Sequence, residues 1–219
     1  MTDTELLREV DLFRDLDADH LEALAAAATT RRLVRNELVF SEGDEPDSLH
    51  IVKRGRLAMV NRSFDGRESV IALMEAGQLF GEMPLFDGLR RSADARALEV
   101  SEIVSLPYEP IRDLYEEQPD LLWRVVELLA IRLRNTDAAL ADSVFLDVTG
   151  RTAKRLLELA GEADEFILPI TQEELAGLVG ASRERVNKAI ASFIRLGWVD
   201  QRDRRYSIVD REQLSRRAR

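Results

Sequence analysis

The feature that most constrains the fold is a stretch in the middle of the chain, from Asp120 to Phe145, that contains neither Gly nor Pro. Its stripe positions recur in alternating steps of four and three, the 3.5-residue period of a coiled-coil heptad. These positions are Leu122, Val126, Leu129, Leu133, Thr136, Leu140 and Ser143. We predict a long helix with a dimerisation seam, because more than three heptads are kept. The alternative is an amphipathic helix packed on its own domain.

Residues 33–107 show no sustained helical period and consist of short β-rich runs, after a helical start over about 4–29. Glycines at 43, 55, 66, 77 and 88 punctuate the runs LVRNELVF, SLHIVKRGRLAMVNR and ESVIALM. Short strands at this spacing, with Asp65-Gly66 as a hairpin turn, predict a compact β-barrel or jelly roll. Such folds commonly enclose a small ligand.

A second domain is predicted after the long helix. Gly150 is the candidate hinge, and residues 151–160 have the pattern of an opening helix. The run FILPI (166–170) is a candidate short strand, and GWVDQRDRRYSIV near the end has the pattern of a two-strand hairpin, as in the wing of a winged helix.

The segment TQEELAGLVGASRERVNKAI (171–190) predicts two short helices joined at a glycine. Thr171 and Glu174 satisfy a capping box at the start of the first helix. Gly180 can adopt the left-handed conformation that ends this helix, and Ser182 is a natural N-cap for the next.

The second of these helices divides into an apolar face and a polar face. Its apolar face consists of Val186, Ala189, Ile190 and Phe193. Its polar face consists of Arg183, Glu184, Asn187 and Lys188. In the major groove Arg or Lys can donate to guanine and Glu can accept from cytosine. We therefore predict a DNA recognition helix; the alternative is a set of ordinary solvated charges.

The charge balance is uneven along the chain. The formal net charge is −10, yet residues 150–219 hold 14 Lys and Arg against 11 Asp and Glu. The acidic surplus therefore lies before residue 150, and a local basic face can still attract phosphate. No apolar run reaches the roughly 18 residues of a membrane span, and the N-terminus lacks the basic start of a secretory signal. A cytoplasmic protein without membrane partners is expected.

The composition excludes several chemistries. The chain has no Cys, which leaves no disulfides, Cys-ligated zinc or Fe–S clusters, and only two His residues. We therefore predict no metal site and no haem. The sequence also lacks a nucleophile–His–acid set and a Walker loop, so an enzyme is not expected.

Three segments resemble the bacterial cyclic-AMP receptor protein (CRP/FNR) family of transcription regulators, particularly its actinobacterial-type members. They are FGEMPLFDGLRRSADARA (80–97), RLRNTDAALADSVFLDVTGR (132–151) and TQEELAGLVGASRERVNKA (171–189). The resemblance covers nearly the whole chain. It implies an α+β fold with an N-terminal β-roll (jelly-roll) cyclic-nucleotide-binding domain, a long dimerisation helix and a C-terminal winged helix-turn-helix. The expected ranges are 1–119, 120–146, a hinge at 147–150, and 151–219.

The first segment matches the family's phosphate-binding cassette, G-E-[LM]-x-[LI]-F…R-[ST]-A. The matching residues are Gly81, Glu82, Met83, Leu85, Phe86, Arg91, Ser92 and Ala93. The resemblance implies that Arg91 and Ser92 donate to a cyclic phosphate and that Glu82 accepts from a ribose hydroxyl. The alternative is a surface Glu–Arg ion pair of little energetic value.

The long helix carries further matches to the family's ligand site. The resemblance implies that Arg132 helps to bind the phosphate and that Thr136 meets the adenine at the dimer interface. The next family position is usually Ser or Asn, whereas this chain has Asp137. Its carboxylate could accept from the adenine amine, but a desolvated carboxylate without a donor would cost binding energy.

The resemblance implies a homodimer that is controlled by cyclic AMP, binds double-stranded DNA and works with RNA polymerase. The family motif R-E-x-x-x-[RK] matches Arg183, Glu184 and Lys188, which implies palindromic half-sites close to TGTGA. The DNA-contacting set predicted here is Thr171, Gln172, Ser182, Arg183, Glu184, Arg185, Asn187 and Lys188. Two alternatives remain open: a regulator of the same fold that needs no effector, and a cyclic-nucleotide module that does not bind DNA.

Overall fold

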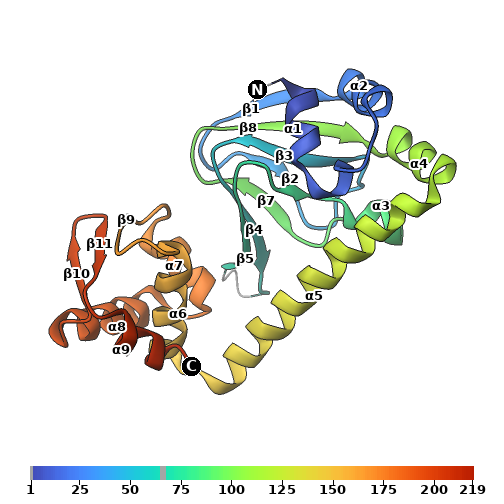
Figure 1. The fold of residues 1–219 in the computed structure, drawn as a ribbon. Coiled ribbons are helices and arrows are strands. Elements are labelled where there is room, and N and C mark those ends of the chain that lie inside the picture. The colour runs from blue at the N-terminus through green and yellow to red at the C-terminus, as the bar shows by residue number, and fades with distance from the viewer. Residues whose placement is uncertain (1, 65–67) are drawn as a thin grey trace. The chain divides into compact units, whose positions relative to one another are not determined.

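The computed structural model describes residues 2–64 and 68–219 (Figure 1). The chain forms two compact units, one comprising residues 1–67 and 71–133 and the other 68–70 and 134–219. The predicted α+β architecture is confirmed, with a β-rich first part, a long helix and a C-terminal helical part with a small sheet. The predicted turn at Asp65-Gly66 lies outside the described residues.

The strands before residue 108 form two four-stranded sheets. One has the order β1-β8-β3-β6 and the other β2-β7-β4-β5. The bounds are β1 (Thr29–Leu33), β2 (Leu38–Phe40), β3 (Ser48–Arg54), β4 (Leu57–Arg62), β5 (Glu68–Met74), β6 (Leu79–Phe80), β7 (Asp94–Ala97) and β8 (Ser101–Pro107). Register pairs such as His50 with Ser105 and Met59 with Ala95 set which side chains share a face.

The apolar core of this unit has two parts because strands β3 and β8 bury both of their faces. One part joins the two sheets and includes Val52, Leu57, Phe80 and Ile103. The other lies beneath the helices and receives Leu49, Ile51, Val104 and Leu106 from the opposite faces of β3 and β8. Alternating side-chain direction along a strand produces this division. The side chain of His50 therefore points toward the sheet with the order β2-β7-β4-β5.

The N-terminal segment departs from the single helical start predicted over about 4–29. It forms α1 (Asp3–Glu9), a 3₁₀ turn (Asp11–Phe13) and α2 (Ala18–Ala27). Val10 is extended and interrupts the helix, and Asp17 caps α2 by accepting from the His20 amide at 2.9 Å. The first strand then begins at Thr29, earlier than the predicted β-rich run.

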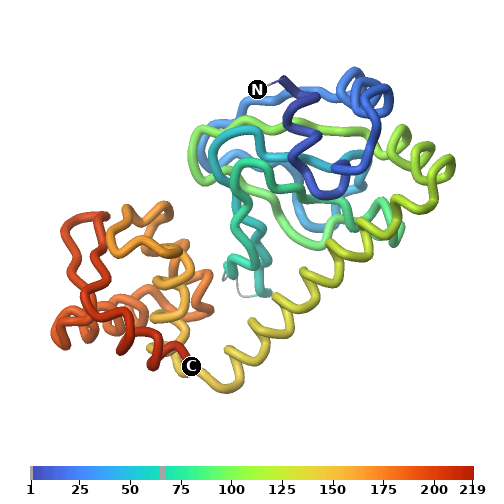
Figure 2. The backbone as a smooth tube through the Cα atoms, viewed as in Figure 1, coloured from blue at the N-terminus to red at the C-terminus, as the bar shows by residue number. Residues whose placement is uncertain are grey.

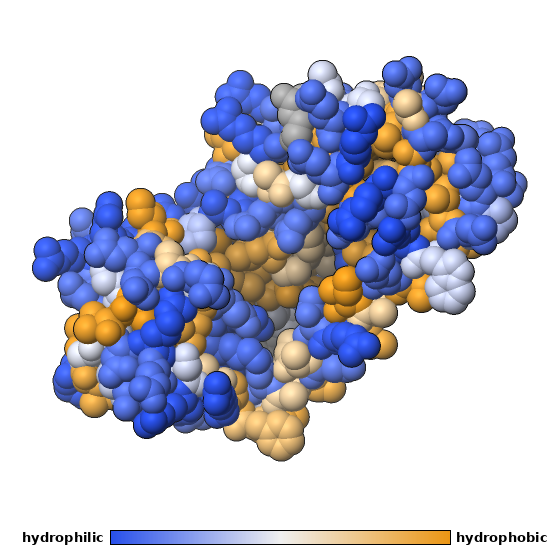
Figure 3. Space-filling model, in the orientation of Figure 1, coloured by the Kyte–Doolittle hydropathy of each residue, from blue (hydrophilic) through white to orange (hydrophobic). Residues whose placement is uncertain are grey.

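The long helix α5 spans Leu122–Phe145, after α4 (Tyr108–Glu117) and a 3₁₀ turn (Pro119–Leu121). Val125 is buried against the roll, with Leu128 partly buried beside it. The apolar residues of the predicted seam all remain exposed, and hydrophobic side chains lie at the surface along α5 (Figure 3). Leu133, for example, is 62% exposed. The alternative in which this stripe packs on its own domain is therefore wrong.

The second unit contains four further helices and a three-stranded sheet with the order β10-β11-β9 among its described residues. Their bounds are α6 (Val148–Ala160), β9 (Glu165–Ile167), α7 (Gln172–Val179), α8 (Arg183–Arg195), β10 (Val199–Arg202), β11 (Arg205–Ile208) and α9 (Arg211–Arg217). The predicted terminal hairpin is present, and the short strand predicted over 166–170 is present but begins at Glu165 and ends at Ile167. Buried Val186, Ala189, Ile190 and Phe193 confirm the predicted apolar face of α8.

The helix after α5 begins earlier than the predicted residue 151. Asp147 caps α6 by accepting from the Gly150 amide at 2.8 Å, so the helix starts at Val148 and Gly150 lies buried within it. The break in helical structure is confined to Leu146 and Asp147. The backbone trace turns between the two helices (Figure 2).

Candidate functional site

The turn after β6 is the centre of the predicted cassette. Gly81 follows Phe80 with φ +75°, a conformation that glycine adopts without the steric cost borne by other residues. A Cβ at this position would lie 2.7 Å from Nη1 of Arg91 and 3.3 Å from both His50 and Phe40. The absent side chain therefore lets the backbone approach Arg91. A short helix, α3 (Met83–Asp87), follows directly.

Glu82 is fully buried and pairs with Arg132 of α5 through Oε1. Arg132 also donates from Nη2 to the Leu79 carbonyl at 2.7 Å. Burial raises the pKa of Glu82, and Arg132 opposes this rise. Within residues 2–64 and 68–219, Glu82 Oε2 has no hydrogen-bond partner although it is buried. A ligand hydroxyl is the kind of group that would satisfy it.

Arg91 is also buried, only 5% exposed, which excludes the alternative of a surface ion pair. Its Nη1 donates to the Gly81 carbonyl at 2.7 Å and to the Tyr108 hydroxyl at 3.0 Å, and its Nη2 donates to the Ser48 carbonyl at 2.7 Å. The guanidinium carbon lies 4.1 Å from the centre of the Phe40 ring. Backbone oxygens and aromatic rings thus hold a cation in the interior.

The sequence did not single out His50, which lies against the same turn. Its ring packs between Phe40 and Phe80, with centroid distances of 5.6 and 5.2 Å, and its Nδ1 lies 2.9 Å from the Ser105 hydroxyl. Burial first, and the Arg91 charge second, lower the pKa of His50 to about 3. The imidazole is therefore neutral at physiological pH. Only the strand register brings it to the cassette, so no local signal could have identified it.

The remaining predicted ligand residues lie in different surroundings. Met83 and Ser92 are exposed, and Ala93 is buried directly before β7. Thr136 and Asp137 are exposed on α5, one turn beyond Arg132. The described residues thus bring Gly81, Glu82, Arg91 and Arg132 together in one unit.

The predicted recognition segment has the caps that its sequence indicated. Thr171 accepts from the Glu174 amide at 3.2 Å while the Glu174 carboxylate accepts from the Thr171 amide at 2.6 Å. Gly180 is left-handed at φ +66°, and Ser182 accepts from the Arg185 amide. The five residues of α8 that are predicted to contact DNA are all exposed. They are Arg183, Glu184, Arg185, Asn187 and Lys188.

Gln172 is half-buried and forms a hydrogen bond to the terminal hairpin. Its amide nitrogen donates to the Tyr206 hydroxyl of β11 at 2.6 Å, and Tyr206 is buried and stacked on Phe166. The bond joins the first turn of α7 to the wing. Gln172 therefore supports the wing in this structure, and Thr171 uses its hydroxyl as a helix cap.

Hydrogen bonds and ion pairs from several residues hold the connection between α5 and α6. Lys154 of α6 donates to Asp142 of α5 at 2.7 Å, and Arg151 donates to the Leu146 carbonyl at 2.7 Å. Arg217 at the end of α9 pairs with both carboxylate oxygens of Asp147. The Gly150 amide and Arg217 hold the pKa of Asp147 below its usual value.

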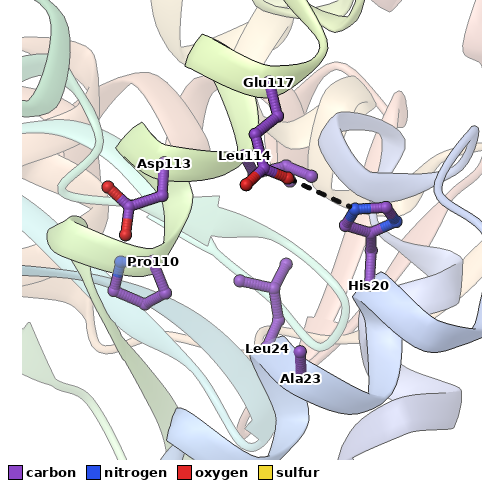
Figure 4. Close-up of a pocket in the computed structure, with 7 residues that line it drawn as sticks. All are labelled: His20, Ala23, Leu24, Pro110, Asp113, Leu114 and Glu117. Carbon is purple, nitrogen blue, oxygen red and sulfur yellow. Dashed lines mark ion pairs between the residues drawn. The ribbon is translucent and has the colours of Figure 1, made fainter.

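A separate hollow lies between α2 and α4 (Figure 4). Its floor is apolar, and His20 and Glu117 face each other across one side with Nε2 and Oε2 3.9 Å apart. All of its lining residues belong to these two helices: His20, Ala23, Leu24, Pro110, Asp113, Leu114 and Glu117. The hollow is therefore not the cassette. The described residues include no helix with the length and apolarity needed to cross a membrane.

Comparison with protein families matches both parts of the chain. Residues 30–118 match the cyclic nucleotide-binding domain, and residues 150–217 match the Crp-like helix-turn-helix domain. The chain is 36% identical over 222 residues to the CRP-like cAMP-activated global transcriptional regulator of Mycobacterium tuberculosis, covering 98% of this chain and 99% of the relative. It is 33% identical over 190 residues to the regulator Vfr of Pseudomonas aeruginosa, covering 82% and 89%.

A solved structure with a similar fold is the c-di-GMP-responsive global regulator CLP of Xanthomonas campestris. It is 27% identical, has a TM-score of 0.76, and is matched over 88% of this chain and 99% of that chain. The catabolite activator protein of Thermus thermophilus is 30% identical with a TM-score of 0.54, and the match covers 95% and 98%. These relatives are regulators rather than enzymes. The chain belongs to the cyclic-AMP receptor protein (CRP/FNR) family of transcription regulators.

Proposed function

We propose that this regulator is a homodimer whose affinity for DNA is raised by cyclic AMP. The observation that carries the proposal is the pair of buried charged residues at the Gly81 turn, each with a polar atom that lacks a partner. These atoms are Glu82 Oε2 and Arg91 Nε, judged over the described part of the chain. An anionic ligand with a vicinal hydroxyl supplies both missing groups, and a cyclic nucleotide has this chemistry.

The choice of cyclic AMP rests on the printed names of relatives, including the cAMP-activated regulator of M. tuberculosis. A c-di-GMP-responsive relative shares the fold, so the fold alone does not select the nucleotide. In the proposed site Arg91, Ser92 and Arg132 bind the phosphate, Glu82 binds the ribose, and Thr136 and Asp137 meet the base. Gly81, Met83 and Ala93 shape the turn.

In the proposed dimer, the exposed stripe of α5 pairs with a second copy. The stripe forms a long exposed apolar surface, and large exposed apolar patches mark interaction surfaces. A ligand that contacts both the roll and α5 can shift the dimer only if it binds one arrangement better than another. Two recognition helices about 34 Å apart would then meet successive major grooves. RNA polymerase is the proposed partner at promoters.

The specific alternative is a regulator that binds DNA without an effector. Asp137 favours it, because an exposed carboxylate on α5 stands where relatives usually carry Ser or Asn. A mobility shift on a TGTGA-N6-TCACA duplex with and without cyclic AMP separates the two readings. We expect nucleotide to tighten binding. Equal binding in both conditions, with no heat on titrating cyclic AMP into the protein, would establish the effector-free alternative.

The proposed base readout is tested on α8 itself. Arg183→Ala should weaken binding to the palindrome by about 1–3 kcal/mol and relax the preference at one guanine. Arg195→Ala is the matched control, since it removes the same charge from the last turn of the same helix. If each variant weakens binding to the palindrome and binding to random DNA by the same factor, Arg183 contacts only phosphate.

A further inference from the structure

The hydrogen bonds of Arg91 leave only one side of its guanidinium for a ligand. A guanidinium has five N–H donors. Gly81 and Tyr108 accept from Nη1, and Ser48 accepts one bond from Nη2. Both Nη1 hydrogens are thereby used, and the donors that remain are Nε–H and one Nη2 hydrogen.

The Nε donor is the more informative of the two. It is buried and has no hydrogen-bond partner anywhere in the described chain. An unsatisfied buried donor is costly, so native proteins rarely keep one without a use. A phosphate oxygen that accepts from Nε removes this cost, and a second oxygen can accept from Nη2.

Tyr108 determines which side of Arg91 is left available. It is the first residue of α4 and is only 4% exposed, and its amide donates to the Asp47 carbonyl at 2.9 Å. Its hydroxyl donates to the Gly81 carbonyl and accepts from Arg91 Nη1. Burial raises the pKa of Tyr108 to about 12, so the hydroxyl keeps its proton across the physiological range.

We infer that Tyr108 is a positioning residue for phosphate recognition: it holds Nη1 of Arg91 so that Nε and Nη2 meet the exocyclic phosphate oxygens. The inference rests on the proposed function, because it concerns the same site. It adds a residue outside the cassette and assigns a definite side of the guanidinium to the ligand. Tyr108 acts through Arg91 and touches no ligand atom itself.

The consequence is chemical selectivity at phosphorus. A cyclic phosphate has two exocyclic oxygens, and a guanidinium fixed in orientation treats them differently. Replacing one or the other by sulfur gives the two phosphorothioate diastereomers, Sp and Rp. Without the Tyr108 hydroxyl, Nη1 keeps only the Gly81 carbonyl as an acceptor, so the orientation of the guanidinium is held less firmly. Discrimination between the diastereomers should then narrow.

The test is calorimetric titration of the full-length chain and its Tyr108→Phe variant with cyclic AMP and with each diastereomer. We expect Tyr108→Phe to weaken cyclic AMP binding roughly tenfold, the loss typical of a hydrogen bond to a charged group. The Sp/Rp affinity ratio should move toward one. Tyr115→Phe is the matched control. It removes a second buried hydroxyl from the same helix, one that has no hydrogen-bond partner among the described residues.

Arg91→Lys provides the coupling control. On this background the Tyr108→Phe change should have no further effect on the affinity ratio, because its partner is gone. Independent, additive effects would overturn the inference, as would a Tyr108→Phe variant that matches Tyr115→Phe in both affinity and ratio. If the unmutated chain binds none of the three nucleotides, the proposed function fails instead.

A labelled unmutated chain covers the case in which Tyr108→Phe does not fold. The chain has three tyrosines, and 3-fluorotyrosine resonances can be assigned with Tyr115→Phe and Tyr206→Phe. Cyclic AMP should shift the Tyr108 fluorine more than the Tyr115 fluorine. Equal shifts would overturn the inference.

Discussion

Replacing Gly81 with Ala should have two effects, which are strain in the backbone and displacement of the Arg91 guanidinium from its hydrogen-bond acceptors. Gly81 has φ +75°, where any residue with a Cβ pays about 1–2 kcal/mol. Its new methyl would also lie 2.7 Å from Nη1 of Arg91, closer than real Cβ contacts allow. The guanidinium must therefore move from its acceptors, which adds roughly 1–3 kcal/mol for disrupted buried hydrogen bonds.

Gly77→Ala isolates the first of these effects. Gly77 has φ +85°, and a Cβ there meets nothing described within 4 Å. Both variants should lose about 1–2 kcal/mol of unfolding free energy from strain, and Gly81→Ala should lose on the order of 1–3 kcal/mol more. Urea unfolding followed by tryptophan fluorescence gives both values, and calorimetry gives cyclic AMP affinity.

The two variants should differ still more in ligand binding. Gly77→Ala should bind cyclic AMP as the unmutated chain does, whereas Gly81→Ala should lose binding because Arg91 no longer presents Nε. Equal stability losses in the two variants, together with normal cyclic AMP affinity in Gly81→Ala, would refute the close approach that the structure shows at this turn.

Two further predictions concern the roll and the seam. The pKa of His50 is lowered from 6.5 to about 3, chiefly by burial and then by Arg91, while Asp47 opposes the shift. The folded state therefore takes up a proton less readily than the unfolded state, and stability is lost as pH falls from 6.5 toward 3. The loss should reach about 2 kcal/mol at pH 5, and urea titrations should show it shrinking in His50→Phe. Leu133→Asp should convert a dimer to monomer in sedimentation equilibrium, whereas Ile131→Asp, on an exposed position outside the seam, should not; equal behaviour of these two variants would place the interface elsewhere.

The helical parts of the fold could be predicted because their signals are local. A heptad period lies within one helix, and the capping box at Thr171 and the glycine at 180 act within a few residues. The start of α6 was missed for a related reason. Asp147 is itself an N-cap, but Gly150 suggested a break, and a glycine inside a helix costs only about 1 kcal/mol.

The candidate ligand site could be predicted only in part. The cassette residues are neighbours in sequence, so a motif identifies them. The groups that hold Arg91 come from elsewhere: Ser48 precedes it by 43 residues and Tyr108 follows it by 17. Antiparallel register and the start of α4 bring these residues together, and neither has a signature at the residue concerned. Burial of Arg91 was missed because a sequence motif does not reveal solvent exposure.

The distribution of ion pairs explains how an acidic chain can attract DNA at one helix. In the second unit, basic residues of the wing and α9 lie within 4 Å of acids: Arg202 pairs with Asp200, and Arg216 with Glu212. Among the residues described, no such pair involves Arg183, Arg185 or Lys188, although all three are exposed on α8.

Phosphate attraction is a sum over cations that can release counterions. Cations already paired with acids contribute less to that sum, and the three on α8 are among the exposed cations of this unit that have no acid within 4 Å in the described part of the chain. The acidic surplus before residue 150 does not attract phosphate. Base contacts, in contrast, act at hydrogen-bond range and do not depend on net charge. Under the proposed function, the acidic sensor weakens binding to random DNA more than binding to a matched palindrome, so its negative charge would support sequence specificity.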